Sequence, residues 1–316
     1  MKIKDLLLQF PENLAEARIL LKHILKISNE EILFKDIEIT EDIAKEFNKL
    51  VSRRRAHEPI SHIICAREFY SINFVVSNDT LDPRPDSETL IDAALSLYQS
   101  TIKNPGRRTS VSERKCTLKS CAPQVTMFDE PGASFVKGLF KKEDNINILD
   151  LGTGTGCLLL TILTYLPNAT GTGIDISDAA LRVANLNKNN LNLNGRANFY
   201  LSNWTEDVEE KFDLVISNPP YIKRSDIKLL QPEIVLYEPH LALDGGLDGL
   251  DPYRIISKNI HKNLNPNARI LVEFGQNQHD DVSKIFCSNN FKLIGYYKDL
   301  GNIIRCALYS QIKMAS

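Results

Sequence analysis

Two helices are predicted in the first 55 residues from the spacing of their apolar positions. In the first, apolar residues recur every three or four positions, at Leu14, Ala17, Leu21, Ile24 and Leu25. The second is predicted to begin after Thr40, which can accept a hydrogen bond as an N-cap. Between residues 60 and 76 the pattern changes to partly alternating β-formers, which predicts a hairpin. A further helix is expected to run to about Tyr98, capped by Asp86 or Ser87.

After residue 145, apolar runs of strand length alternate with helical segments. The predicted strands cover residues 146–151, 172–176, 197–201, 214–217 and 269–274, and the predicted helices cover 157–166, 178–190, 251–263 and 280–289. This alternation implies a mostly parallel, doubly wound α/β sheet. The last two apolar runs, 291–298 and 303–309, are joined by four residues, which leaves no room for a crossover helix. We therefore expect a C-terminal antiparallel hairpin that closes the sheet.

Length and composition are those of a globular protein with about two domains. The chain has 316 residues, of which 43% are hydrophobic and 25% charged. The net charge of −2 argues against a dedicated, strongly basic nucleic-acid binder. Residues 101–145 contain turn residues and no sustained period, so we expect a surface insertion that is largely disordered. A basic tether for RNA is the alternative, because residues 101–120 hold six basic residues and one acid.

Six cysteines are scattered along the chain, with no Cys-x-x-Cys pair and no cluster with histidine at zinc spacing. No metal site is therefore predicted, and the cysteines are expected to be the reduced thiols of a cytoplasmic protein. The longest uncharged stretch, residues 151–174, is interrupted by glycines, threonines and a proline, so no membrane association is expected. The N-terminus carries no recognisable secretory signal.

A glycine-rich loop joins the first predicted strand of the sheet to its helix. It consists of Gly152, Thr153, Gly154, Thr155 and Gly156. Alternating glycines allow a sharp turn and a close approach to a ligand, and the following helix offers free N–H groups. The G-x-G-x-G spacing differs from the dinucleotide fingerprint and from a P-loop. A purely structural turn is the alternative reading.

Asp175 lies at the carboxyl end of the second predicted strand of the sheet, 19 residues after Gly156. In a doubly wound sheet, an acid at this position can reach the hydroxyl groups of a ribose. The alternative is an aspartate that caps a helix or faces solvent. Together with the glycine-rich loop, Asp175 predicts an adenosine-type cofactor at the carboxyl ends of the strands.

The tetrapeptide Asn218-Pro219-Pro220-Tyr221 follows another apolar strand. An ordinary turn is one interpretation, since Asn-Pro starts turns well. The two prolines nevertheless make the segment rigid, so its polar groups must have defined directions. The oxygen of Asn218 and the carbonyl of Pro219 can accept both N–H bonds of an amide and orient its nitrogen toward an electrophilic methyl group. The Tyr221 ring can stack on a planar amide or base.

These motifs resemble those of S-adenosylmethionine-dependent methyltransferases with a Rossmann-like sheet. Four further stretches are similar to the peptide chain release factor glutamine methyltransferases of the PrmC/HemK family. They are residues 53–60 (RRRAHEPI), 68–70 (EFY), 80–88 (TLDPRPDSE) and 238–254 (EPHLALDGGLDGLDPYR). The resemblance covers nearly the whole chain outside 101–145.

The resemblance implies N5-methylation of the glutamine in the Gly-Gly-Gln motif of class 1 release factors. It implies that residues 152–156 hold the methionine part of S-adenosylmethionine, that Asp175 binds its ribose, and that Trp204 packs against it. Asn218 would lie beside both cofactor and substrate. Residues 1–80 would form a helical substrate-binding domain with a β-hairpin linker, and residues 81–316 a catalytic domain that contains the insertion 101–145. We expect a monomer, with no nucleic acid among its partners.

Other interpretations stay open at this point. An N6-adenine methyltransferase of nucleic acid also fits the Asn-Pro-Pro-Tyr motif, although the near-neutral charge disfavours it. The methylated residue could also be a glutamine of another protein. Alternatively, the chain could be a catalytically inactive scaffold that binds the release factor. Without the resemblance, a core aromatic is the favoured interpretation of Trp204. Asn203 stands where the family usually has Asp, which removes a charge from the expected adenine contact.

Overall fold

The computed structural model describes residues 2–34, 37–99, 139–141 and 143–312. The predicted insertion 101–145 therefore lies outside the described residues, except for 139–141 and 143–145. The two described ends of this region meet, because β3 (Tyr98–Gln99) pairs in parallel with β4 (Phe140–Lys141). The rings of Tyr98 and Phe140 lie 5.4 Å apart.

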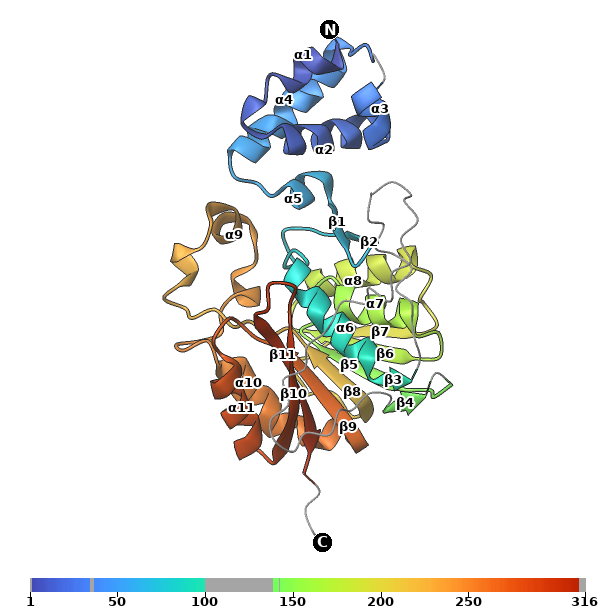
Figure 1. Cartoon of the computed structure of the whole chain (residues 1–316), viewed down its shortest axis with the longest axis vertical. Helices are drawn as coiled ribbons and strands as arrows, with labels where there is room; N and C mark the ends of the chain where they lie inside the picture. Colours follow the sequence, from blue (N-terminus) through green and yellow to red (C-terminus); the bar gives the residue numbers. More distant parts are fainter. Residues whose placement is uncertain (1, 35–36, 100–138, 142, 313–316) are drawn as a thin grey trace, which may run out of the picture.

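Four helices form the N-terminal unit at the top of Figure 1. They are α1 (Ile3–Leu7), α2 (Leu14–Leu25), α3 (Asn29–Phe34) and α4 (Glu41–Arg55). The two predicted helices are confirmed as α2 and α4. Thr40 caps α4 by accepting a hydrogen bond from the N–H of Ile43 at 3.4 Å. The apolar faces meet in a core of their own around the fully buried Leu20, Leu21 and Phe47.

A short helix and a hairpin lead from these helices to the main sheet. The segment consists of α5 (Ile60–Ile64), β1 (Ala66–Phe69), β2 (Ile72–Val75), the 3₁₀-helix η2 (Pro85–Ser87) and α6 (Glu88–Ser96). The predicted hairpin is confirmed for β1 and β2 and wrong for residues 60–64, which form α5. Pro59 precedes this helix, and Ile60, Ile63 and Ile64 repeat at helix spacing, which explains the difference.

The main sheet has the strand order β10-β11-β9-β8-β5-β6-β7. Its strands are β5 (Asn147–Leu151), β6 (Thr170–Asp175), β7 (Ala197–Leu201), β8 (Phe212–Ser217), β9 (Leu264–Glu273), β10 (Phe291–Lys298) and β11 (Ile304–Gln311). Neighbours from β7 to β9 pair in parallel, and β11 is antiparallel to both β9 and β10. The mostly parallel sheet and its C-terminal antiparallel hairpin are therefore confirmed.

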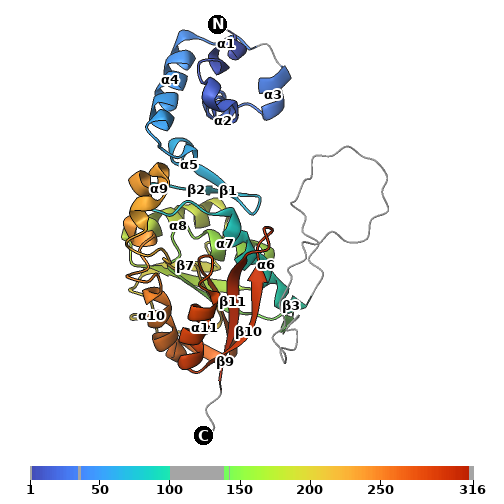
Figure 2. The same cartoon turned by 60° about the vertical axis from the view of Figure 1, so that its left-hand side comes forward.

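Helices cover both faces of this sheet, as Figures 1 and 2 show. They are α6, α7 (Cys157–Tyr165), α8 (Asp178–Asn190), α10 (Asp251–Asn259) and α11 (His279–Ser288), with α9 (Pro232–Tyr237) outside the sheet layers. Successive residues of a strand point to opposite faces of the sheet, so their side chains contribute to two separate hydrophobic cores. Ile148 belongs to the core that includes α6 and α7, and Leu149 to the core that includes α10 and α11. Phe69 and Phe74 of the hairpin are buried in the first of these cores.

The N-terminal helices contact α9 through Arg54 of α4. Its guanidinium donates to Glu16 of α2 at 2.7 and 3.0 Å and to Glu233 of α9 at 2.7 Å. The Tyr237 hydroxyl also donates to the carbonyl of Ala56 at 2.9 Å. The predicted N-terminal domain includes the hairpin, yet the hairpin shares a core with the sheet. The domain division at residue 80 therefore stays a prediction.

Asn187 of α8 fastens the hairpin to the glycine-rich loop. Its Oδ1 accepts from the N–H of Val75 at 2.7 Å, and its Nδ2 donates to the carbonyls of Val75 (3.0 Å) and Thr155 (2.9 Å). The side chain is 1% exposed. All three partners are backbone groups that lose their bond if the amide is removed.

We expect Asn187→Ala to lower the free energy of unfolding by roughly 1–3 kcal/mol or more, because buried polar groups lose their partners. Urea unfolding followed by circular dichroism measures this. The control is Asn185→Ala on the same helix, because the Asn185 amide donates to the carbonyl of Leu181 within that helix. Equal stability of the two variants would contradict the assigned role of Asn187.

Candidate active site

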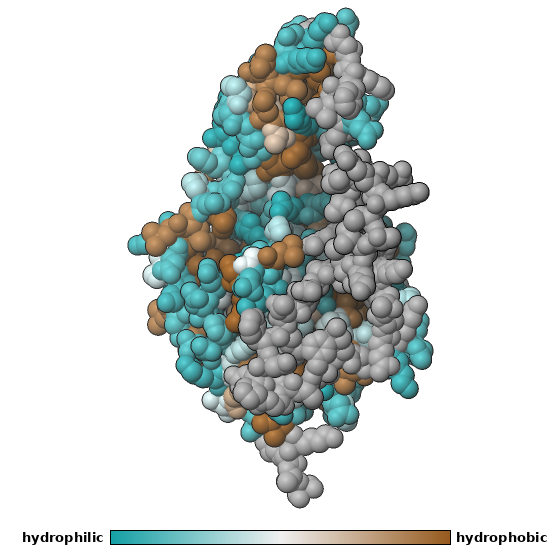
Figure 3. Space-filling view, viewed as in Figure 1, coloured by the Kyte–Doolittle hydropathy of each residue, from teal (hydrophilic) through white to brown (hydrophobic). Residues whose placement is uncertain are grey.

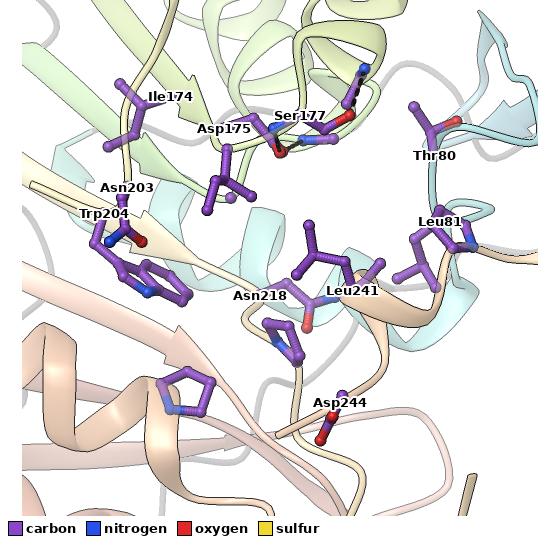
Figure 4. Close-up of a pocket in the computed structure, with 18 of the residues that line it drawn as sticks. Thr80, Leu81, Ile174, Asp175, Ser177, Asn203, Trp204, Asn218, Leu241 and Asp244 are labelled. Atoms are coloured by element: carbon purple, nitrogen blue, oxygen red, sulfur yellow. Dashed lines mark hydrogen bonds between the residues drawn. The ribbon is translucent and has the colours of Figure 1, made fainter. Parts of the chain in front are cut away.

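A cavity of about 360 Å³ lies at the carboxyl ends of β5, β6 and β8. The predicted site residues that line it are Gly152, Gly154, Asp175, Trp204, Asn218 and Pro220. Figure 4 shows Trp204 on one side of the hollow and Thr80 and Leu81 on the other, with Asp175 and Asn218 between them. The structure thus brings together residues that are widely separated in the sequence.

The glycine-rich loop turns in the left-handed backbone region. Gly152 and Gly154 have φ angles of +72° and +55°, and the space where a Cβ atom would project is open at both. The loop is held by the carbonyl of Ile174, which accepts from the N–H groups of Gly152 (3.0 Å) and Thr153 (2.9 Å). The two glycines therefore present bare backbone to the cavity.

The other three predicted loop residues do not line this cavity. The Thr153 hydroxyl donates to the buried carboxylate of Asp150 at 2.7 Å. Thr155 is 2% exposed, and its carbonyl accepts from Asn187. Gly156 has φ +76° at the start of α7, where a Cβ atom would lie 3.0 Å from the Phe199 ring. These residues shape the loop.

Asp175 is held by backbone groups at the end of β6. Its Oδ2 accepts from the N–H of Gly154 and its Oδ1 from that of Ser177, both at 2.9 Å. Burial raises the pKa of Asp175, while these bonds oppose the change. The capping role belongs to Ser177, whose hydroxyl accepts from the N–H of Ala180 at 3.2 Å. Each carboxylate oxygen of Asp175 keeps a lone pair for a ligand.

Trp204 is the one tryptophan of the chain and forms part of the cavity wall. Its φ angle is +52°, and its carbonyl accepts from the Ser202 hydroxyl at 3.0 Å. The amide of the adjacent Asn203 donates to Glu206 Oε1 at 2.8 Å. No hydrogen bond from a described residue reaches the side-chain oxygen of Asn203, so this oxygen can act as an acceptor at the same wall.

Asn218 lies immediately after β8, at the junction of two cavities. The second cavity, of about 260 Å³, shares Leu81, Asn218 and Ala242 with the first and is also lined by Pro219 and Tyr221. The Asn218 Nδ2 donates to the Ser87 hydroxyl at 3.0 Å. The remaining predicted residues of the motif thus divide between the cavities, with Pro220 in the first and Pro219 and Tyr221 in the second.

A buried carboxyl group stands behind Asn218. Glu273, the last residue of β9, is 1% exposed. Burial raises its pKa to about 7, although hydrogen bonding by Ser87 and Asn218 and the charge of Arg305 lower it. Burial also raises the pKa of the Tyr221 hydroxyl, so this phenol is neutral at physiological pH.

Sequence reasoning missed both groups that contact the Asn218 amide. We expected the Ser87 side chain to be able to cap α6, but it makes no capping hydrogen bond, and its hydroxyl accepts from Asn218 instead. Glu273 carried a usable signal, since it is a single acid at the end of the apolar run Ile270-Leu271-Val272. Such an acid at the carboxyl edge of a parallel sheet indicates a functional position.

The walls of the cavities come from two loops that also had no assigned role. Residues 79–81 precede η2, and residues 239–246 follow α9. Arg84 and Glu238 join the two loops, with Nη2 of the arginine 2.6 and 2.7 Å from the two carboxylate oxygens. Burial raises the pKa of Glu238 to about 7, and Arg84 opposes this rise.

Comparisons with known proteins agree with this architecture. The family model described as "PrmC N-terminal domain" matches residues 2–64, and the "Methyltransferase small domain" matches residues 126–246. A release factor glutamine methyltransferase of Rhodospirillum rubrum is 37% identical over 93% of this chain and 77% of its own length. One from Agrobacterium fabrum is 33% identical, over 91% and 87%.

The chain belongs to the release factor glutamine methyltransferase family. It also matches a bifunctional methyltransferase of Rickettsia felis, with 36% identity over 95% of this chain. The chain spans about half the length (54%) of that relative. The chain thus contains a methyltransferase domain, for which S-adenosylmethionine is the cofactor.

The first cavity fits this cofactor in size and chemistry. It combines open space beyond two glycines, the half-buried carboxylate of Asp175 and an indole ring. Within the part of the chain that the structure describes, no helix combines the length and apolar character needed to cross a membrane. No group of three potential metal ligands occurs among the same residues.

We expect Asp175→Asn to weaken S-adenosylmethionine binding by about 10- to 100-fold, the effect of losing a charged hydrogen-bond acceptor. Because Trp204 is the one tryptophan and lines the cavity, its fluorescence should report binding directly. The matched control is Asp178→Asn, since this exposed residue forms an ion pair with Arg182 on its own helix and does not line the cavity. The placement of the cofactor would be contradicted if Asp175→Asn bound S-adenosylmethionine as tightly as the wild type. It would also be contradicted if the Trp204 fluorescence did not change on cofactor binding.

Proposed function

We propose that this protein methylates the N5 nitrogen of the glutamine in the Gly-Gly-Gln motif of class 1 peptide chain release factors. The observation that carries the proposal is the position of Asn218 in the wall shared by two cavities. One cavity fits the cofactor, and the other can admit a side chain of a protein substrate. Family membership supports the same assignment.

In the cofactor cavity, the Asp175 carboxylate would accept the ribose hydroxyls, and Trp204 would offer a flat apolar surface to the adenine. Asn203 can accept a hydrogen bond there through its free oxygen. The bare backbone at Gly152 and Gly154 leaves room for the methionine part. When bound, S-adenosylmethionine supplies an electrophilic methyl group.

Asn218 and Pro219 would act on the substrate amide. A glutamine NH₂ group is a poor nucleophile, since its lone pair is delocalised into the carbonyl. The Asn218 Oδ1 and the Pro219 carbonyl can each accept one of its two N–H bonds, which orients the nitrogen and favours developing positive charge. Among the described residues, no backbone N–H bonds to the Pro219 carbonyl. The neutral Tyr221 ring would pack against the planar amide.

An apolar surface around α9 supports a protein substrate. Leu229, Leu236, Leu241 and Leu247 are 59–83% exposed, and Leu241 lines the cofactor cavity. Figure 3 shows hydrophobic residues gathered on the side of the molecule where α9 lies. Clustered exposed leucines are typical of protein interaction sites. The N-terminal helices, which contact α9 through Arg54, would help to hold the release factor.

We expect purified protein and labelled S-adenosylmethionine to label a class 1 release factor, and not a variant with the Gly-Gly-Gln glutamine changed to alanine. Asn218→Ala should reduce the rate by roughly 100-fold or more, because an aligned acceptor is lost from the reacting group. The control is Asn198→Ala, an exposed residue on β7. Peptide mapping by mass spectrometry locates the methyl group.

Equal labelling of the release factor and its alanine variant would overturn the proposed target. Labelling of DNA, abolished by Asn218→Ala, would instead favour N6-adenine methylation. The monomeric state, the absence of nucleic-acid partners and the cytoplasmic location stay predictions from the sequence.

A further inference from the structure

Three side chains from distant parts of the chain meet behind the active-site cavities. Glu273 ends β9, Ser87 ends η2, and Asn218 follows β8. Glu273 and Ser87 are 1% and 3% exposed, so water contributes little to their hydrogen bonding. The Asn218 Nδ2 donates to the Ser87 hydroxyl at 3.0 Å. Ser87 and Asn218 are also the two side chains whose hydrogen bonding lowers the pKa of the Glu273 carboxyl group. The cluster therefore determines which atoms of the Asn218 amide face inward.

An ionised carboxylate can only accept hydrogen bonds, and Asn carries both donors and an acceptor. A flipped Asn218 would bring its Oδ1 against the Glu273 carboxylate and would replace attractive contacts with repulsive ones. Glu273 Oε2 has no hydrogen-bond partner among the described residues, so a donor is what this side of the cluster requires. The NH₂ group is held inward, and Oδ1 is left for the cavities.

We infer that Glu273, assisted by Ser87, is a positioning residue that fixes the Asn218 amide with its oxygen toward the substrate. The inference rests on the proposed function, in which that oxygen accepts an N–H bond from the target glutamine. Neither Glu273 nor Ser87 lines the cavities. Both would act through Asn218 alone.

The protonation of Glu273 should control this orientation. A protonated carboxyl group has an O–H that can donate to Oδ1, so it no longer excludes the flipped amide. Burial raises the pKa of Glu273 to about 7, so the orienting charge is present above this pH and is lost as the pH falls through it. The other charged and titratable groups around this carboxyl are Arg305, Asp86, Tyr221, Tyr253, Cys157 and Cys306.

We expect Glu273→Gln to lower the turnover number by roughly 10- to 100-fold, because a charge-assisted hydrogen bond is lost. Affinity for S-adenosylmethionine, followed by Trp204 fluorescence, should stay unchanged. The fall in wild-type turnover below about pH 7 should be absent in the variant. Ser87→Ala should retain this pH dependence, since the carboxylate remains. The control is Glu210→Gln. Glu210 is exposed, and its carboxylate accepts a hydrogen bond from the Tyr200 hydroxyl.

A variant Glu273→Gln with wild-type turnover and an unchanged pH profile would overturn the inference. A second measurement does not depend on activity or on the stability of the variant. In the wild-type protein labelled with [¹⁵N]asparagine, the side-chain NH₂ signals of Asn218, assigned by their loss in Asn218→Ala, should shift with a midpoint near pH 7.

If these NH₂ signals do not titrate and Glu273→Gln also leaves them unshifted, Glu273 does not orient the amide and the inference fails. If they titrate but the wild-type enzyme labels no release factor, the positioning holds and the proposed target fails. The two claims are therefore tested separately.

Discussion

β5 pairs in parallel with β6 on one side and with β8 on the other, so that Leu151 lies opposite both Ile174 and Ser217. The Ser217 hydroxyl adds a bond to the carbonyl of Leu151 at 2.8 Å. This register places the starts of three loops at one edge: the glycine-rich loop, the loop after Asp175 and the Asn-Pro-Pro-Tyr segment. A shift of β8 by one residue would turn its alternating side chains to the opposite faces. The site exists because these three strand ends coincide.

Three buried acids belong to the segments that form the site, and burying them costs free energy. Asp150, Glu238 and Glu273 are all buried, and burial raises the pKa of each to about 7. Each one orients a neighbour: Asp150 accepts from Thr153 in the loop, Glu238 holds Arg84, and Glu273 bonds to Asn218 and Ser87. An apolar replacement would avoid the penalty of burying a charge, so we attribute these residues to the geometry of the site.

The periodic elements were predictable from the sequence because burial on one or both faces imposes a regular pattern. This holds for α2, α4 and the sheet with its final hairpin. α5 was missed, since the helix spacing of its three isoleucines spans only five residues and is directly followed by a hairpin pattern. The candidate site was predictable where a motif joins a strand end, as at Asp175 and Asn218. Whether each of these residues has its predicted role stays to be tested.

Contacts between distant segments were not predictable in this way. The Ser87 side chain had a plausible local role as a helix cap, and only the tertiary packing directs its hydroxyl to Asn218. The walls formed by residues 79–81 and 239–246 likewise depend on how two loops pack together. Thr153, Thr155 and Gly156 show the opposite error. They belong to the glycine-rich motif and were predicted to bind the cofactor, but they do not line the cavity. Sequence motifs locate such a site, but they do not tell which of their residues contact the ligand.

In the proposed mechanism, Asn218 and Pro219 present only hydrogen-bond acceptors to the side chain of the substrate. The most direct test compares the affinity of the cofactor-bound protein for a class 1 release factor with a Gly-Gly-Gln motif and for a Gly-Gly-Glu variant. The two side chains have nearly the same shape, but the carboxylate of glutamate has no N–H to donate. Fluorescence anisotropy should show tighter binding of the glutamine form, and Asn218→Ala should reduce the difference. Equal or tighter binding of the glutamate form would contradict the account.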